Sequence, residues 1–187
     1  RLTIGETPYP AAAFPAGYQL GSAAEIEWIG PHLAPGTKQS VAGRQNPAVD
    51  TSRSSYPLRY VAPSGANHSG LDLPLMVGAY PEVAESEPND ERSQTKLVVW
   101  PTTINGRFQR LGDADWYRVK LEAQQKIWFE THAHRFIRSP VDTLIQVYDA
   151  NGVLLGENDD EAFEPGYECY HDYKTTDSKL LFTAPAA

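Results

Sequence analysis

The sequence predicts an all-β protein of two β-sandwich modules, the C-terminal one jelly-roll-like. Three observations support this fold class. Residues 1–80 contain short apolar runs separated by Pro and Gly, without a sustained period of 3.6 residues. Several later runs alternate polar and apolar side chains, as half-buried strands do. Turn signals recur every ten or so residues, which is typical of sandwiches.

In the first half of the chain, residues 24–29 alternate clearly and end at Gly30, so they predict a strand. Residues 37–55 are polar and predict an exposed loop. Residues 56–61 and 73–78 predict strands, and their prolines favour edge or starting positions. This half predicts one β module, residues 1–81.

In the second half, the pair Asn151-Gly152 between two apolar runs predicts a hairpin, and Asn105-Gly106 predicts another turn. Three tryptophans, Trp28, Trp116 and Trp128, lie in alternating runs and are expected in the core. The strands predicted here cover residues 97–100, 116–121, 127–134, 143–149, 153–155 and 180–183. Together they predict a second module over residues 82–187.

Composition excludes several function classes. The 24 acidic and 16 basic residues give a formal charge of -8, which disfavours binding to nucleic acid or to anionic membranes. A single cysteine, Cys169, permits no disulfide within the chain, and no run approaches the ~20 apolar residues that span a bilayer. Because the chain opens directly on a strand-like run, we expect a segment of a longer, exported protein.

An acidic motif at residues 85–90 predicts a cation site. Glu85, Glu87 and Asn89 follow one another at i, i+2 and i+4, so an extended backbone directs their oxygens to one side. Asp113 and Asp115 repeat this spacing before another alternating run. With Asp90, these residues offer five carboxylates and one amide carbonyl, and calcium takes about six to eight oxygen ligands.

Helix capping is the alternative interpretation of the same motif. Residues 91–96 could form one helical turn capped by Asn89 or Asp90, both good N-cap residues, with the remaining acids solvated. The acidic loop at residues 156–168 is expected to be solvated.

These motifs carry a family resemblance. Residues 82–187 resemble the bacterial pre-peptidase C-terminal domain, a β-sandwich family that includes collagen-binding modules of secreted collagenases. The matching segments, in order, are Glu85-x-Glu87-Pro88-Asn89-Asp90, Gly112-Asp113-x-Asp115-Trp116-Tyr117, Val147-Tyr148-Asp149-Ala150-x-Gly152, Asn158-Asp159-Asp160 and residues 181–185. The resemblance implies a non-catalytic module with calcium ligands at Glu85, Glu87, Asn89, Asp90, Asp113 and Asp115. Family members continue with a further strand after residue 185, which this sequence lacks.

The first module has a resemblance of its own. Glycines and apolar spacing in residues 11–80 are similar to the start of immunoglobulin-like modules of the IPT/TIG type.

No enzyme is expected. HExxH, CxxC and Gly-x-Ser-x-Gly do not occur. His132 and His134 at i, i+2 could ligate zinc with His171 or Cys169, but two polar residues on the solvent face of a strand are the simpler interpretation.

The sequence therefore predicts a calcium-binding spacer, adhesion or targeting segment of a bacterial secreted, periplasmic or surface protein. Its partners would be the other domains of the parent chain. The alternative is a binding module that recognises a polysaccharide or a fibrous extracellular protein through Tyr167, Tyr170 and Tyr173, which lie near the acidic loop.

Overall fold

The computed structural model describes residues 8–41, 58–64, 72–161 and 175–186 of the 187-residue chain. Every regular element in these ranges is a β-strand except one 3₁₀ turn, Arg92–Gln94, so the all-β prediction is confirmed. In the same ranges no helix has the length and apolar character needed to cross a membrane.

The chain divides into a first unit, Arg1–Lys120, and a second unit, Leu121–Ala187. The module boundary predicted after residue 81 lies inside the first unit. The assignment of the strands to two sandwich modules stays a prediction.

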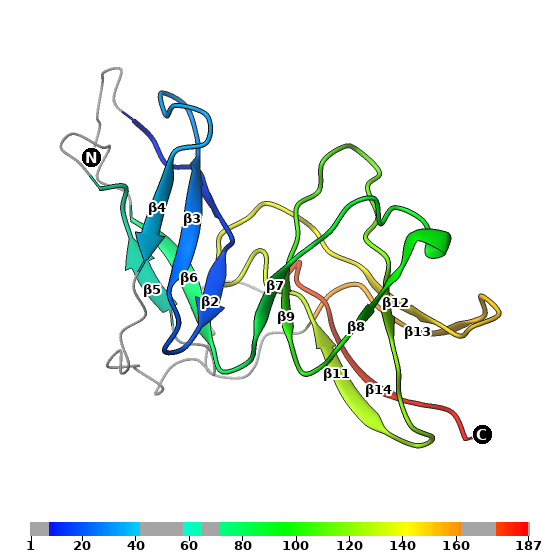
Figure 1. Cartoon of the computed structure of the whole chain (residues 1–187). Coiled ribbons are helices and arrows are strands. Elements are labelled where there is room, and N and C mark those ends of the chain that lie inside the picture. Colours follow the sequence, from blue (N-terminus) through cyan, green and yellow to red (C-terminus); the bar gives the residue numbers. More distant parts are fainter. Residues whose placement is uncertain (1–7, 42–57, 65–71, 162–174, 187) are drawn as a thin grey trace. The chain divides into compact units, whose positions relative to one another are not determined.

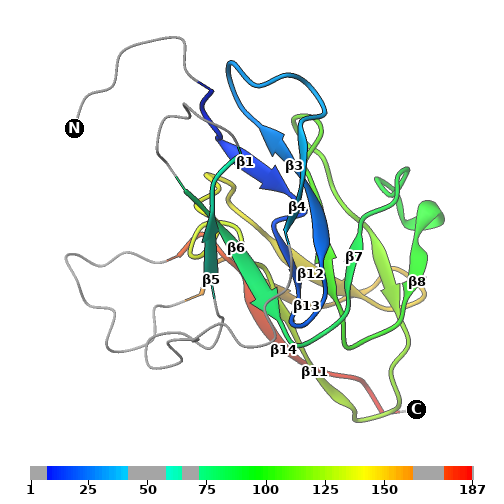
Figure 2. The same cartoon turned by 60° about the vertical axis from the view of Figure 1, so that its left-hand side comes forward.

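Two three-stranded sheets begin the first unit, and Figures 1 and 2 show their strands. One sheet has the order β1-β3-β4 and the other β2-β6-β5. Their bounds are β1 Ala12–Phe14, β2 Gly17–Gln19, β3 Ala24–Ile29, β4 Lys38–Val41, β5 Leu58–Val61 and β6 Leu73–Gly78. The strands predicted at residues 24–29 and 73–78 are therefore confirmed.

Both sheets contribute to one apolar core. Trp28 and Ile26 from β3 are fully buried together with Leu75 from β6, and the cluster also includes Tyr18, Val41, Val61 and Val77. Alternation in β3 explains this, because Ile26 and Trp28 lie two residues apart and so share one face of the strand. The core position predicted for Trp28 is confirmed.

The rest of the first unit consists of two parallel ladders. Strand β7, Glu82–Ala84, pairs with β9, Thr103–Asn105, and β8, Lys96–Val98, pairs with β10, Tyr117–Val119. Asn105 is buried at the end of β9, where its side chain accepts from Ala16 N–H (2.9 Å) and donates to Glu82 (2.8 Å). The turn predicted at Asn105-Gly106 is wrong, because residues 106–109 form neither a turn nor a bend after β9.

The second unit contains two antiparallel ladders. Strand β11, Lys126–Glu130, pairs with β14, Lys179–Thr183, and β12, Ile145–Tyr148, pairs with β13, Leu154–Asn158. The hairpin predicted at Asn151-Gly152 is confirmed: Gly152 has a φ of 90°, which favours glycine.

One side chain expected in the core of this unit is exposed. Trp128 is 57% exposed on the face that it shares with Leu181, and the Lys179 ammonium lies 5.2 Å from its ring centre. The prediction that Trp128 is a core residue is wrong. The opposite face of the ladder is the covered one, where the Phe129 ring packs against the Phe182 ring.

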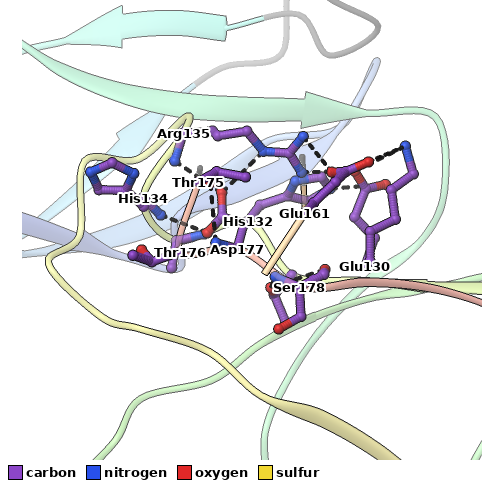
Figure 3. Close-up of polar contacts among 12 residues, drawn as sticks. Glu130, His132, His134, Arg135, Glu161, Thr175, Thr176, Asp177 and Ser178 are labelled. Atoms are coloured by element: carbon purple, nitrogen blue, oxygen red, sulfur yellow. Dashed lines mark hydrogen bonds and ion pairs between the residues drawn. The ribbon is translucent and has the colours of Figure 1, made fainter. Parts of the chain in front are cut away.

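A buried carboxylate organises the polar part of the second unit (Figure 3). The Asp177 side chain is fully buried. Its oxygens accept from the backbone N–H groups of Ala133 (2.8 Å), His134 (2.7 Å) and Arg135 (2.9 Å), and from the Arg135 guanidinium (3.2 Å). Arg135 also pairs with Glu130 (3.1 Å) and Glu161 (2.7 Å). Asp177 therefore fixes the backbone that follows β11.

Candidate metal site

Two loops of the first unit run side by side between the two parallel ladders. The first loop, residues 85–95, joins β7 to β8, and the second, residues 106–116, joins β9 to β10. In one ladder Ala84 pairs with Asn105, and in the other Lys96 pairs with Tyr117. Both loops therefore leave one ladder together and enter the other together. This pairing brings the acidic motif at residues 85–90 beside the one at residues 113–115.

Three carboxylates converge where the loops meet. Glu85 and Glu87 from the first loop and Asp115 from the second each offer an oxygen, and these oxygens all lie within 4.8 Å of one another. This is the group of acids that could hold a metal ion among the residues that the structure describes. All three belong to the set predicted from the sequence.

The two oxygens of Glu85 have different surroundings. Oε1 accepts from Arg107 N–H (2.8 Å), whereas Oε2 is buried without a hydrogen-bond partner. A buried acceptor without a donor costs free energy, and a cation would supply the missing interaction. Gly106 makes room for this oxygen, since a Cβ at that position would lie 2.9 Å from Glu85 Oε2 and 3.4 Å from Asp115 Oδ2.

Asn89 lies beside the three acids and is only 3% exposed. Its backbone N–H donates to Glu87 Oε2 (3.0 Å), and its backbone oxygen accepts from Trp116 N–H (2.8 Å), which ties the two loops together. With its nitrogen toward Glu87, the side-chain amide donates to both oxygens of that carboxylate (3.1 and 2.6 Å). Turned the other way, the same amide presents its oxygen to Glu87 and donates from its nitrogen to Asp115 Oδ1 (3.4 Å).

The remaining two predicted residues have a different partner. The Arg110 guanidinium lies 2.9 Å from Asp90 Oδ1 and 3.6 Å from Asp113 Oδ1. Asp113 Oδ2 also accepts from Gln109 N–H (2.7 Å). The prediction that all six residues are metal ligands stays a prediction. In this structure, however, Asp90 and Asp113 are paired with the positively charged side chain of Arg110.

The electrostatics of the three acids reflect this crowding. Burial, with the charges of Glu85, Asp113 and Glu87, raises the pKa of Asp115 to about 6. Burial also raises the pKa of Glu85, with a further contribution from Glu87. In Asp113 the opposite holds, because the hydrogen bond from Gln109 N–H lowers its pKa. The repulsion is therefore concentrated on Glu85 and Asp115, and the charge of Arg107 offsets part of it at Glu85.

An apolar pocket of about 310 Å³ adjoins the acids and was not expected from the sequence. Glu85 and Asn89 form part of its lining, and most of the remaining lining is apolar: Val83, Ala84, Leu97, Val98, Val99, Ile104, Trp116 and Tyr117. Burial accordingly raises the pKa of Tyr117 as well, with contributions from Asp115, Glu85 and Glu87.

The alternative interpretation, in which Asn89 or Asp90 caps a helical turn, does not agree with the structure. The 3₁₀ turn Arg92–Gln94 takes Glu91 as its N-cap, and the Gln94 side chain accepts from Glu91 N–H (2.9 Å). Asn89 and Asp90 lie before the cap and face the second loop. The prediction that Asn89 or Asp90 caps this turn is therefore wrong.

The other candidate residues do not gather into a site in the described ranges. His132 lies after β11 with a largely covered side chain, 3.8 Å from Glu130 and edge-on to Phe136, and burial lowers its pKa. Its predicted place on a solvent-facing strand is thus wrong. Tyr167, Tyr170 and Tyr173, together with Cys169 and His171, lie outside the described residues.

Comparison with known proteins adds no relative. The chain matches no family of known proteins, no curated protein and no solved structure.

Proposed function

We propose that this chain is a non-catalytic, calcium-binding segment of a larger exported or cell-surface bacterial protein, which it serves as a spacer, adhesion or targeting element. The observation that carries the proposal is the convergence of Glu85, Glu87 and Asp115 around a buried, unpartnered oxygen of Glu85. All the available donor atoms are oxygens, which suits a hard cation, and calcium accepts irregular carboxylate sets better than magnesium does.

The protein residues supply the binding and the positioning. Glu85 and Glu87 supply ligands from one loop and Asp115 supplies one from the other, and the Asn89 amide can turn its oxygen toward Glu87. A bound calcium ion would neutralise the repulsion among the acids and link the two loops. Since these loops join both parallel ladders, the link would stiffen this part of the first unit.

The alternative function, recognition of a polysaccharide or fibrous protein, depends on three tyrosines outside the described residues. No observation within the described ranges favours it over the cation site.

Thermal melting of the whole chain tests the proposal. Calcium at about a hundredfold excess over its Kd should stabilise the native state by ~2.7 kcal/mol. For a chain of this size that corresponds to a rise in Tm of roughly 5 to 10 °C. Magnesium at equal concentration should give a smaller rise, because it needs stricter octahedral geometry. Coincident melting curves in calcium and in chelator, with no heat of binding on titration, would refute the proposal.

Gly106→Ala should weaken calcium binding without unfolding the protein. The new Cβ would press on Glu85 Oε2 and Asp115 Oδ2, and Gly106 is exposed, so the carboxylates rather than the core must move. We expect an increase in Kd of about tenfold, at the lower end of what changes around metal ligands cost. Gly78→Ala is the control, because its Cβ would contact Glu82 at an ordinary 3.6 Å. Equal affinities of the two variants would show that Gly106 does not shape the site.

A further inference from the structure

Five of the six carboxylates of the two loops separate into two groups with different partners, and the sixth, Glu91, caps the 3₁₀ turn. Glu85, Glu87 and Asp115 face one another. Asp90 and Asp113, one from each loop, face the single guanidinium of Arg110, at 2.9 and 3.6 Å. One basic side chain thus bridges the loops at one place, whereas within the described part of the chain the three remaining acids form no ion pair with a basic side chain.

Gln109 connects the two groups. Its backbone N–H donates to Asp113 Oδ2 (2.7 Å), and its side-chain Nε2 donates to Glu87 Oε1 (2.7 Å). The Asp113 side chain is almost wholly covered by these contacts, with 2% of its surface exposed. The Arg110 charge is consequently close enough to the acids for Glu87 to contribute to the raised pKa of Arg110, after the larger contributions of Asp90.

We propose that Arg110 is a built-in counter-charge that occupies Asp90 and Asp113 and thereby limits the calcium affinity of the Glu85, Glu87 and Asp115 group. The inference rests on the proposed calcium function. Two physical effects support it. The positive guanidinium repels an incoming cation, and it engages two carboxylates that would otherwise strengthen the negative field at the site. Arg110 is therefore an affinity-determining residue that itself contacts no ion.

Calcium affinity of the whole chain, measured by competition with a chromophoric chelator, tests this role. Arg110→Gln should tighten calcium binding by roughly three- to tenfold at low salt, as expected for removing one exposed like charge at short range. The gain should shrink as salt is added. Arg110→Lys keeps the charge and should stay within about twofold of the parent. Arg118→Gln, which removes the same charge from exposed β10, should have less effect than Arg110→Gln.

A double-mutant cycle separates this role from a merely structural one. Asp113→Asn should weaken calcium binding less in the parent, where Arg110 neutralises Asp113, than in the Arg110→Gln background, where the carboxylate is released. If Arg110 only held the loops in place, Arg110→Gln would bind calcium more weakly than the parent. That result would overturn the proposal. Unchanged affinity in Arg110→Gln would also overturn it. A parent that binds no calcium would instead refute the proposed function itself, so the two failures are distinguishable.

Discussion

Asp115→Asn should make the protein less stable than the parent in calcium but more stable than the parent in chelator. In calcium the variant should melt below the parent, because it lacks one of the three converging carboxylates. In chelator it should melt above the parent, because the pKa of about 6 at Asp115 shows that burial and the charges of Glu85, Asp113 and Glu87 oppose its ionisation. Allowing for partial solvent screening, we expect a gain of about 1 kcal/mol without calcium.

The control for this reversal is Asp142→Asn, which removes the same charge from an exposed residue of the second unit. It should leave the calcium-dependent rise in Tm intact. Differential scanning calorimetry at pH 7, with calcium and with chelator, measures both arms. Asp115→Asn that keeps the full calcium-dependent rise would exclude Asp115 as a ligand. A variant less stable than the parent in both conditions would show that Asp115 has a structural role.

Asp177→Asn should cause the largest loss of stability in the second unit. The substitution leaves Arg135 partly buried without one of its anions, and it directs an amide toward three backbone N–H donors. Removing one partner of a buried pair costs about 3 to 5 kcal/mol. Urea unfolding followed by circular dichroism measures the loss. Hydrogen exchange at the amides of Ala133, His134 and Arg135 should locate it. Asp159→Asn, which alters an exposed carboxylate, is the matched control.

The same carboxylate gives the second unit a defined acid dependence. Burial alone would raise the pKa of Asp177, but the three backbone N–H groups and the guanidinium outweigh burial and lower it. The stabilisation is therefore complete above the unfolded-state pKa of about 3.9 and is lost as the pH falls through the lower folded-state pKa. The difference in unfolding free energy between parent and Asp177→Asn should accordingly shrink below about pH 4. A constant difference down to pH 2 would contradict this account.

Strand positions followed from the sequence, whereas strand pairing did not. Alternation located β3 and β12, and Asn151-Gly152 located the hairpin after β12, because these signals are local. The parallel ladders β7–β9 and β8–β10 join segments about twenty residues apart, so no short-range pattern reveals them. Trp128 shows another limit. Alternation separates two faces of a strand but does not say which face is covered when both carry apolar side chains.

The candidate site divides in the same way. The i, i+2 spacing predicted that Glu85 and Glu87 act together, and the structure brings Asp115 to them. The sequence did not indicate that Arg110 would reach both Asp90 and Asp113, because that contact depends on the loops lying side by side. The sequence indicates only a turn at Gly106, since its closeness to Glu85 arises from the parallel register.

The two parallel ladders share one register, and this has a consequence for how the sequence can vary. Glu82 pairs with Thr103 and Lys96 pairs with Tyr117, the same separation of 21 positions in both ladders, so the intervening loops have equal lengths. Inserting or deleting one residue in only one loop would shift one ladder against the other and move its side chains to the opposite face. Related sequences should therefore tolerate a length change in one loop only when the other loop changes by the same number of residues.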